Sequence, residues 1–212
     1  MAIFHGVRTK TAVLLAGVVG IAAGALGLGL ARLAVLPPQE YVHFHANWAL
    51  WLNGDRIDFT GDEYMEDVGL CMAADAEITG PGRVHLHENN ADVLHIHHDG
   101  VTWGHFLQNL GWAMGPDWVM TDRQEMYRDG EGARLTFILN GFRVPPVNER
   151  LIRPGDRLLT SFGSESVEEL VRYRFPEVAS NAPTYDETFD PAGCQGQEPE
   201  TFSNRLRRAF GL

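Results

Sequence analysis

The histidines of this chain are concentrated and regularly spaced. Eight of the nine lie between His43 and His105, and six of these form His-x-His pairs. The pairs are His43 and His45, His85 and His87, and His95 and His97. On a β-strand, residues two apart project from the same face, so each pair would present two imidazoles side by side. Neutral imidazole binds zinc, copper, nickel and iron, and the pattern therefore predicts a transition-metal site.

The second and third pairs are expected to lie on one hairpin. The segment from Val84 to His98 alternates polar and apolar residues on both sides of a turn within Glu88 to Asp92. All four histidines have odd numbers, so a loop of three or five residues would place them on the same face. A two-residue loop would put the pairs on opposite faces. The alternation predicts that the histidines face away from the core or into a polar pocket.

Other side chains near the pairs are expected to have lesser roles. His98 points to the opposite face from its neighbour, and His105 falls in a predicted helix, so neither is expected to be a ligand. Carboxylates could bind the ion, but are expected rather to orient the imidazoles; the candidates are Glu88, Asp92 and Asp99. Methionines would favour copper(I), although they usually fill cores; the candidates are Met65, Met72 and Met114. Copper and zinc are the expected ions.

The elements around the pairs indicate an α+β domain with a mixed sheet. A strand is predicted over 42–52, turning through Asn53-Gly54 into a returning strand over 56–59. A second Asn-Gly turn at 140–141 joins strands over 135–139 and 142–144, and a last strand is predicted over 157–162. Thr102 can cap a helix over 103–110.

An apolar segment near the N-terminus is long enough to cross a bilayer. Thr11 to Ala31 is a run of 21 residues without a charge, which would span about 31 Å as a helix. Arg8 and Lys10 precede it, and positive residues favour the cytoplasm. We therefore expect a single-pass cell-membrane protein with its N-terminus inside and its domain periplasmic or extracellular. The alternative is a cleaved signal peptide, for which the apolar run is long.

Small residues in this segment could pack against another helix. Gly20 and Gly24 form a GxxxG motif, and Ala16 extends the same stripe. The alternative is that these residues simply fill a helix that faces lipid. The expected partners are thus the lipid bilayer and, through Gly20 and Gly24, transmembrane helices of a multi-subunit membrane complex.

Charge and cysteine content exclude some classes of function. The net charge is −11, and acidic residues dominate after residue 36, which disfavours nucleic-acid binding. Only two cysteines are present, Cys71 and Cys194, and they form no CxxC motif. A thiolate zinc site is therefore not indicated. In an oxidising compartment the two cysteines could form a disulfide, or they could be unrelated thiols.

The chain is expected to have three parts. Residues 1–36 are the predicted transmembrane anchor, and Pro37-Pro38 ends its helix. Residues 37–163 form the histidine-rich extracytoplasmic domain. Residues 164–212 are expected to be an extended C-terminal tail with short helices, because residues 176–200 are rich in Pro, Asp, Glu, Asn and Gly.

The histidine segment resembles an uncharacterised family of small, membrane-anchored bacterial and archaeal proteins. The resemblance is carried by His85-Leu-His87, by His95-Ile-His97 and by the stretch Gly100-Val-Thr-Trp-Gly-His-Phe106, within residues 41–163. It implies metal binding by the six paired histidines and no particular reaction. The segments 138–144 and 151–159 are more weakly similar to the end of ubiquitin-like β-grasp domains, with 102–111 as the grasped helix.

Three functions follow from these patterns. The first is a membrane-anchored extracytoplasmic protein that binds copper or zinc through paired histidines. The second is an accessory subunit of a respiratory or photosynthetic membrane complex, which docks through the GxxxG helix and the tail. The third is a metal-dependent hydrolase or oxidase, but the sequence lacks an HExxH motif and a nucleophile constellation. No catalytic residue is therefore assigned.

Overall fold

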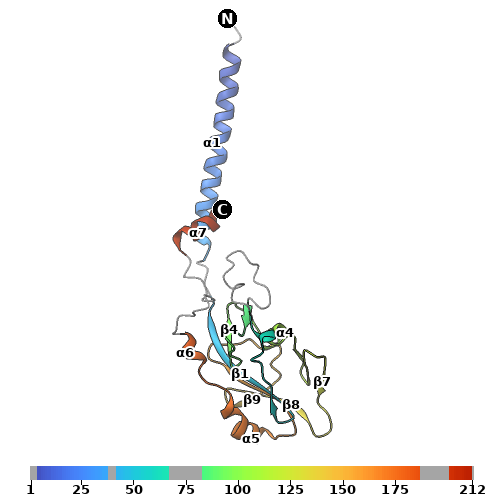
Figure 1. The fold of residues 1–212 in the computed structure, drawn as a ribbon. Helices are drawn as coiled ribbons and strands as arrows, with labels where there is room; N and C mark the ends of the chain where they lie inside the picture. The colour runs from blue at the N-terminus through green and yellow to red at the C-terminus, as the bar shows by residue number, and fades with distance from the viewer. Residues whose placement is uncertain (1–3, 38–41, 67–82, 187–200, 212) are drawn as a thin grey trace. The chain divides into compact units, whose positions relative to one another are not determined.

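The computed structural model describes residues 4–37, 42–66, 83–186 and 201–211 (Figure 1). The chain forms two compact units. One contains residues 1–41 and 197–212, and the other contains residues 42–196. Both cysteines, and Met72, lie outside the described residues, so the disulfide stays a prediction.

The first unit consists of α1 (Phe4–Val35) and α7 (Phe202–Phe210). Within α1, the segment Val13–Val35 is long and apolar enough to cross a membrane, as predicted for residues 11–31. Its apolar side chains are largely exposed; Val13 and Leu28, for example, retain 72% and 63% of their surface. An apolar helix left uncovered by the described part of the chain is typical of a lipid-facing or partner-facing segment.

The second unit is built on a mixed sheet, which confirms the α+β prediction. Its strands lie in the order β3-β4-β1-β10-β8-β9, and β2 pairs with β1. They are β1 (Phe44–Leu52), β2 (Asp55–Arg56), β3 (Val84–His85), β4 (Val93–Ile96), β8 (Arg134–Leu139), β9 (Phe142–Val144) and β10 (Arg157–Gly163). The β1 and β10 strands are parallel, and the other pairs are antiparallel.

Two predicted Asn-Gly hairpins are present. Asn53 and Gly54 join β1 to β2, and Asn140 and Gly141 join β8 to β9. All four residues have positive φ, which is the conformation that two-residue hairpin turns require and that Asn-Gly tolerates. The returning strand after Asn53-Gly54 is only two residues long, so the prediction for 56–59 was too extended.

The remaining short elements flank this sheet. Thr102 caps α4 (Trp103–Asn109) as predicted, because its side chain accepts a hydrogen bond from the His105 backbone N–H. A small antiparallel sheet and several helical turns complete the unit, and the turns between residues 167 and 186 are among the short helices predicted for the C-terminal tail. They are η1 (Asp62–Tyr64), β5 (Ala113–Met114), β6 (Trp118–Met120), β7 (Met126–Arg128), α5 (Val167–Glu169), η2 (Leu170–Arg174), η3 (Phe175–Glu177) and α6 (Ala182–Asp186).

The central strand β1 is buried on both faces. Its even-numbered residues, including Trp48 and Leu50, join the main apolar core with residues of α4. On the other face, Ala49 and Trp51 pack with Leu170 of η2 and with Val178. The segment 164–186, which the sequence assigned to an extended tail, therefore packs against the sheet within the same compact unit.

Candidate metal centre

The register of three neighbouring strands aligns the histidines. His95 in β4 pairs with His85 in β3 and with His45 in β1, so these residues form a row across the sheet. The β3–β4 register joins odd-numbered residues to odd-numbered residues, as the odd-length turn required. Glu88 and Asn89 form part of this turn and have positive φ. The prediction that both pairs lie on one face of the hairpin is confirmed.

The histidine face is buried. His45, His85, His87 and His95 expose only 1–3% of their surface, and the other two, His43 and His97, are half-buried. They lie on the face of the sheet opposite Trp48, so they avoid the main apolar core as predicted. Of the two predicted possibilities, the structure shows an enclosed polar cluster and not a solvent-facing surface.

Helix α6 contacts β1 beside the histidines. Asn47, the next odd-numbered residue of β1 after His45, accepts a hydrogen bond from the Ala182 backbone N–H through its side-chain oxygen, at 2.8 Å. Its amide nitrogen donates to the side chain of Asn181 at 3.0 Å. This arrangement places the Tyr185 ring 5.7 Å from the His45 ring, centroid to centroid. The C-terminal part of the unit thus completes the histidine site.

The six paired imidazoles form one continuous cluster. The ring centroids of His45 and His95 are 4.3 Å apart, and those of His87 and His95 are 3.7 Å apart. On the other side, the His97 ring lies 4.8 Å from that of His43 and 5.1 Å from that of His85. Residues separated by up to 54 positions in the sequence therefore share one site, and the three pairs do not form isolated sites.

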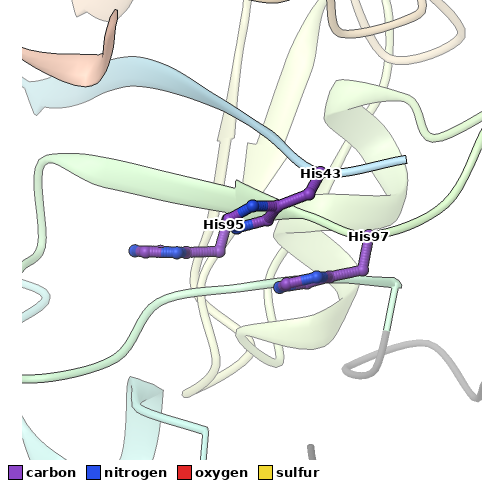
Figure 2. A group of neighbouring side chains, drawn as sticks. All are labelled: His43, His95 and His97. Atoms are coloured by element: carbon purple, nitrogen blue, oxygen red, sulfur yellow. The ribbon is translucent and has the colours of Figure 1, made fainter. Parts of the chain in front are cut away.

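Three of these side chains form a group that can hold a metal ion. His43, His95 and His97 each offer a ring nitrogen, and these nitrogens lie within 4.8 Å of one another. Figure 2 shows His43 where the chain enters β1, and His95 and His97 at the end of β4, with the three rings close together. The Nε2 atom of His97 is buried and has no hydrogen-bond partner among the described residues. A buried lone pair or N–H without a partner is unfavourable, and a bound ion would relieve this at an unprotonated nitrogen.

A carboxylate at the edge of the cluster constrains the protonation of two imidazoles. Oδ1 of Asp186 lies 2.6 Å from Nδ1 of His45, so Nδ1 carries the proton and donates it to the carboxylate. In a neutral His45 ring Nε2 is then an acceptor, and it lies 2.9 Å from Nδ1 of His95, as does Nε2 of His87. A neutral His95 that donates through Nδ1 to either of these nitrogens keeps the lone pair of its own Nε2 available to a metal ion.

Burial keeps the central imidazoles neutral. The pKa of His95 lies far below its ordinary value, first because of burial and then because of the neighbouring His87 and His45. Burial, followed by the proximity of His85 and His43, lowers the pKa of His97 to about 2. Metal ions bind unprotonated imidazole, so these side chains need not lose a proton before binding at neutral pH.

Most of the secondary candidates lie elsewhere. Asp92 pairs with Arg56, with 2.5 Å between Oδ1 and Nη2. Glu88 lies 3.9 Å from Nδ1 of His87, which is beyond hydrogen-bond distance. Met114 belongs to the apolar core, and Met65 packs against it, so neither supports the prediction of a copper(I) ligand. His105 takes part in the capping box of α4, where its ring accepts from the Thr102 backbone N–H.

The comparisons with known proteins add no identity: no family model, curated protein or solved structure matches the chain. The resemblance to the uncharacterised anchored family and the similarity to β-grasp domains therefore stay predictions. The geometry of the histidine cluster is what indicates a metal centre.

Proposed function

We propose that this protein is a membrane-anchored, extracytoplasmic metal-binding protein that holds zinc or copper in its buried histidine cluster. The observation that carries the proposal is the convergence of His43, His95 and His97, whose ring nitrogens lie within 4.8 Å of one another. Histidine is common on half-buried strands, but Nε2 of His97 is buried without a hydrogen-bond partner among the described residues, and burial disfavours such a group unless a ligand satisfies it.

Coordination distances indicate how the cluster would change on binding. Two imidazole nitrogens at 2.0–2.1 Å from one ion are at most about 4.2 Å apart. Because two ligands of a tetrahedral ion are roughly 3.4 Å apart, the widest pair in the group of His43, His95 and His97, whose nitrogens lie within 4.8 Å of one another, must approach by up to about 1.4 Å. Rotation of the half-buried rings of His43 and His97 would supply this movement. Nδ1 of His95 lies 2.9 Å from the Nε2 atoms of His45 and His87. These are hydrogen-bond distances, and they are shorter than the roughly 3.4 Å that separates two ligands of a tetrahedral ion.

The ligand chemistry favours Zn²⁺ or Cu²⁺. The cluster offers neutral imidazoles and the Asp186 carboxylate, with no cysteine or methionine sulfur among the described residues that contact it. Imidazole suits both ions, whereas Cu⁺ prefers thiolate or thioether ligands. Three imidazoles with an open position would also suit hydrolytic or oxidative chemistry, but no residue is assigned to such a step.

The proposed location follows from α1. The exposed apolar surface of Val13–Val35 supports a retained membrane span, and Arg8 and Lys10 before it support an N-terminus in the cytoplasm. A Cβ added at Gly20 or Gly24 would contact nothing within 4 Å. This open surface supports a second proposal, that α1 also packs against a helix of a larger membrane complex.

Metal analysis tests the proposed function. We would purify the full chain in mild detergent, measure its metal content by mass spectrometry, and titrate metal-depleted protein with Zn²⁺ and with Cu²⁺. We expect stoichiometric binding, and loss of at least about 100-fold in affinity when His43, His95 and His97 are all changed to Ala. Circular dichroism would check that the variant remains folded.

His98→Ala provides the matched control. Nδ1 of His98 lies 2.6 Å from the Asp99 carbonyl oxygen, and the ring is not among those that contact the cluster. This variant should bind metal like the wild type. A wild-type protein that binds neither ion above background would overturn the proposal, as would equal binding by the folded triple variant.

A further inference from the structure

Helix α7 is a well-defined amphipathic helix. It begins after Thr201, whose Oγ1 accepts a hydrogen bond from the Asn204 backbone N–H at 3.2 Å. It ends at Gly211, whose φ of 70° suits a glycine C-cap. Phe202, Leu206 and Ala209 are spaced i, i+4 and i+7, so they share one face of the helix.

Arginines of α7 bind the C-terminal carbonyls of α1. Pro37 has no backbone N–H, so the Leu33 carbonyl four residues earlier lacks its usual helical donor. Nη2 of Arg205 donates to this carbonyl oxygen at 3.1 Å and to that of Leu36 at 2.7 Å. Nη2 of Arg208 donates to the Pro37 carbonyl oxygen at 2.7 Å. These cations also lie at the negative end of the α1 dipole, where positive charge is favourable.

Close packing adds to these hydrogen bonds. Ala209 is 1% exposed, and the Phe210 ring occupies the space beside Gly29 that a Cβ would fill. Helix α7 is therefore attached to the last turns of α1 by both polar and apolar contacts. Those turns are the end of the predicted membrane span.

The exposed surface of α7 has an apolar side and a polar, basic side. Phe202 is 71% exposed and Leu206 is 38% exposed, on the face that continues from Ala209. Arg207 and Asn204 are exposed on the other side of the helix. An exposed apolar face with basic residues around it is typical of helices that lie in the plane of a membrane interface.

We propose that α7 lies in the lipid headgroup layer at the end of the α1 span, with Phe202 and Leu206 among the acyl chains and Arg207 toward lipid phosphates. The inference rests on the membrane anchor of the proposed function. The depth follows from the attachment, because the end of a membrane span lies where the hydrocarbon gives way to headgroups. Arg205 and Arg208 satisfy carbonyls that would otherwise meet this boundary without a donor.

Photocrosslinking to lipid tests the proposed depth. The full chain, with p-benzoylphenylalanine at position 206, would be reconstituted into vesicles of phosphatidylcholine and phosphatidylglycerol and irradiated. We expect phospholipid adducts by mass spectrometry at position 206, and at least about tenfold fewer with the same label at position 204 on the other side of the helix. Equal yields at both positions, or no phospholipid adduct at position 206, would overturn the inference.

Two further measurements separate the possible failures. Resistance to alkaline extraction from the vesicles tests the anchor alone, so an extracted protein refutes the span, whereas a retained protein without adducts refutes only the position of α7. Arg205→Gln removes two hydrogen bonds to carbonyls, and should speed amide hydrogen exchange in α7 by about tenfold or more. Arg207→Gln, the matched control, should leave exchange within about twofold, and equal effects of the two changes would refute the attachment.

Discussion

The two faces of β1 are equally buried, but their side chains differ in the contacts that stabilise them. On one face, Trp48 is 1% exposed and its ring packs against Phe59 and Phe106 at centroid distances of 4.8 and 4.5 Å. On the other face, whose later residues Ala49 and Trp51 join a smaller apolar cluster, His45 is also 1% exposed but contacts imidazoles and a carboxylate. The apolar face gains stability from burial itself, whereas the imidazole face depends on each nitrogen finding a partner.

This difference separates folding from binding within one strand. The apolar face should determine whether the domain folds, because each large side chain there contributes burial and packing. The imidazole face should determine what the folded domain binds, and its loss should cost less stability. Substitutions on the two faces can therefore test the comparison directly.

The largest expected effect is on the apolar face. Trp48→Ala removes a buried ring and a 2.8 Å hydrogen bond from its Nε1 to the Ala91 carbonyl oxygen. We expect the free energy of unfolding to fall by about 3–5 kcal/mol, measured by denaturant titration of the metal-free protein. Trp48→Phe should lose less than half as much free energy of unfolding as Trp48→Ala. A loss below about 1 kcal/mol for the alanine variant would contradict the assigned role of this face.

The imidazole face should make the metal-free protein sensitive to acid. The folded-state pKa values of His95 and His97 lie well below the unfolded value of about 6.5, so below pH 6.5 the unfolded chain binds protons that the folded protein does not. Stability should therefore fall as pH falls, by about 1.4 kcal/mol per pH unit for each histidine.

Denaturant midpoints between pH 7.5 and 5 would measure this dependence. Above about pH 7.5 these two histidines should not change the free energy of unfolding with pH. Below about pH 6 the dependence should approach its full value of about 1.4 kcal/mol per pH unit for each histidine. The double variant His95→Gln and His97→Gln should be much less sensitive. If the wild type and the double variant show the same slope, the buried neutral imidazoles are not its source.

A smaller effect is expected at the carboxylate that orients the cluster. Asp186→Asn weakens the acceptor for the Nδ1 proton of His45, and should reduce metal affinity by about 10–100-fold without unfolding the domain. Nitrogen NMR shifts of the His45 ring in the metal-free protein should show a less uniform tautomer. Asp92→Asn is the matched control, because that carboxylate pairs with Arg56, and it should leave affinity unchanged.

The smallest effect is expected next to the cluster in sequence. His98→Ala should change the free energy of unfolding by no more than about 0.5 kcal/mol and leave metal affinity within about twofold, because the side chain lies outside the imidazole cluster. Calorimetric titration and denaturant unfolding would check both quantities. A large loss of affinity would show that the alternation of faces fails at the end of β4.

Much of the hairpin geometry could be predicted because it depends on local rules. The alternation of side chains and the odd-numbered spacing placed His85, His87 and His95 on one face, and the Asn-Gly turns identified two hairpins. Asn47 could have been added by continuing the same alternation along β1.

The contact between Asp186 and the histidine cluster could not be predicted in the same way. Asp186 lies in a short helix within a segment whose composition indicates an irregular tail, and no periodicity links it to His45. Its position depends on Leu170 and Val178 packing against the sheet, which is a tertiary effect that local propensity does not report. The composition of the segment therefore predicts irregular structure, but it does not predict which residues the segment contacts.

The separation of His45 from Asp186 by 141 residues also has a consequence for the timing of synthesis. At 5–20 residues per second, a ribosome needs roughly 7–28 s after making His45 to add the carboxylate that orients it. During that interval the imidazoles exist without this carboxylate, so an ion bound then would be held by an incomplete site. If the cluster binds metal as proposed, selective loading therefore belongs to the time after the segment 164–186 has packed against the sheet.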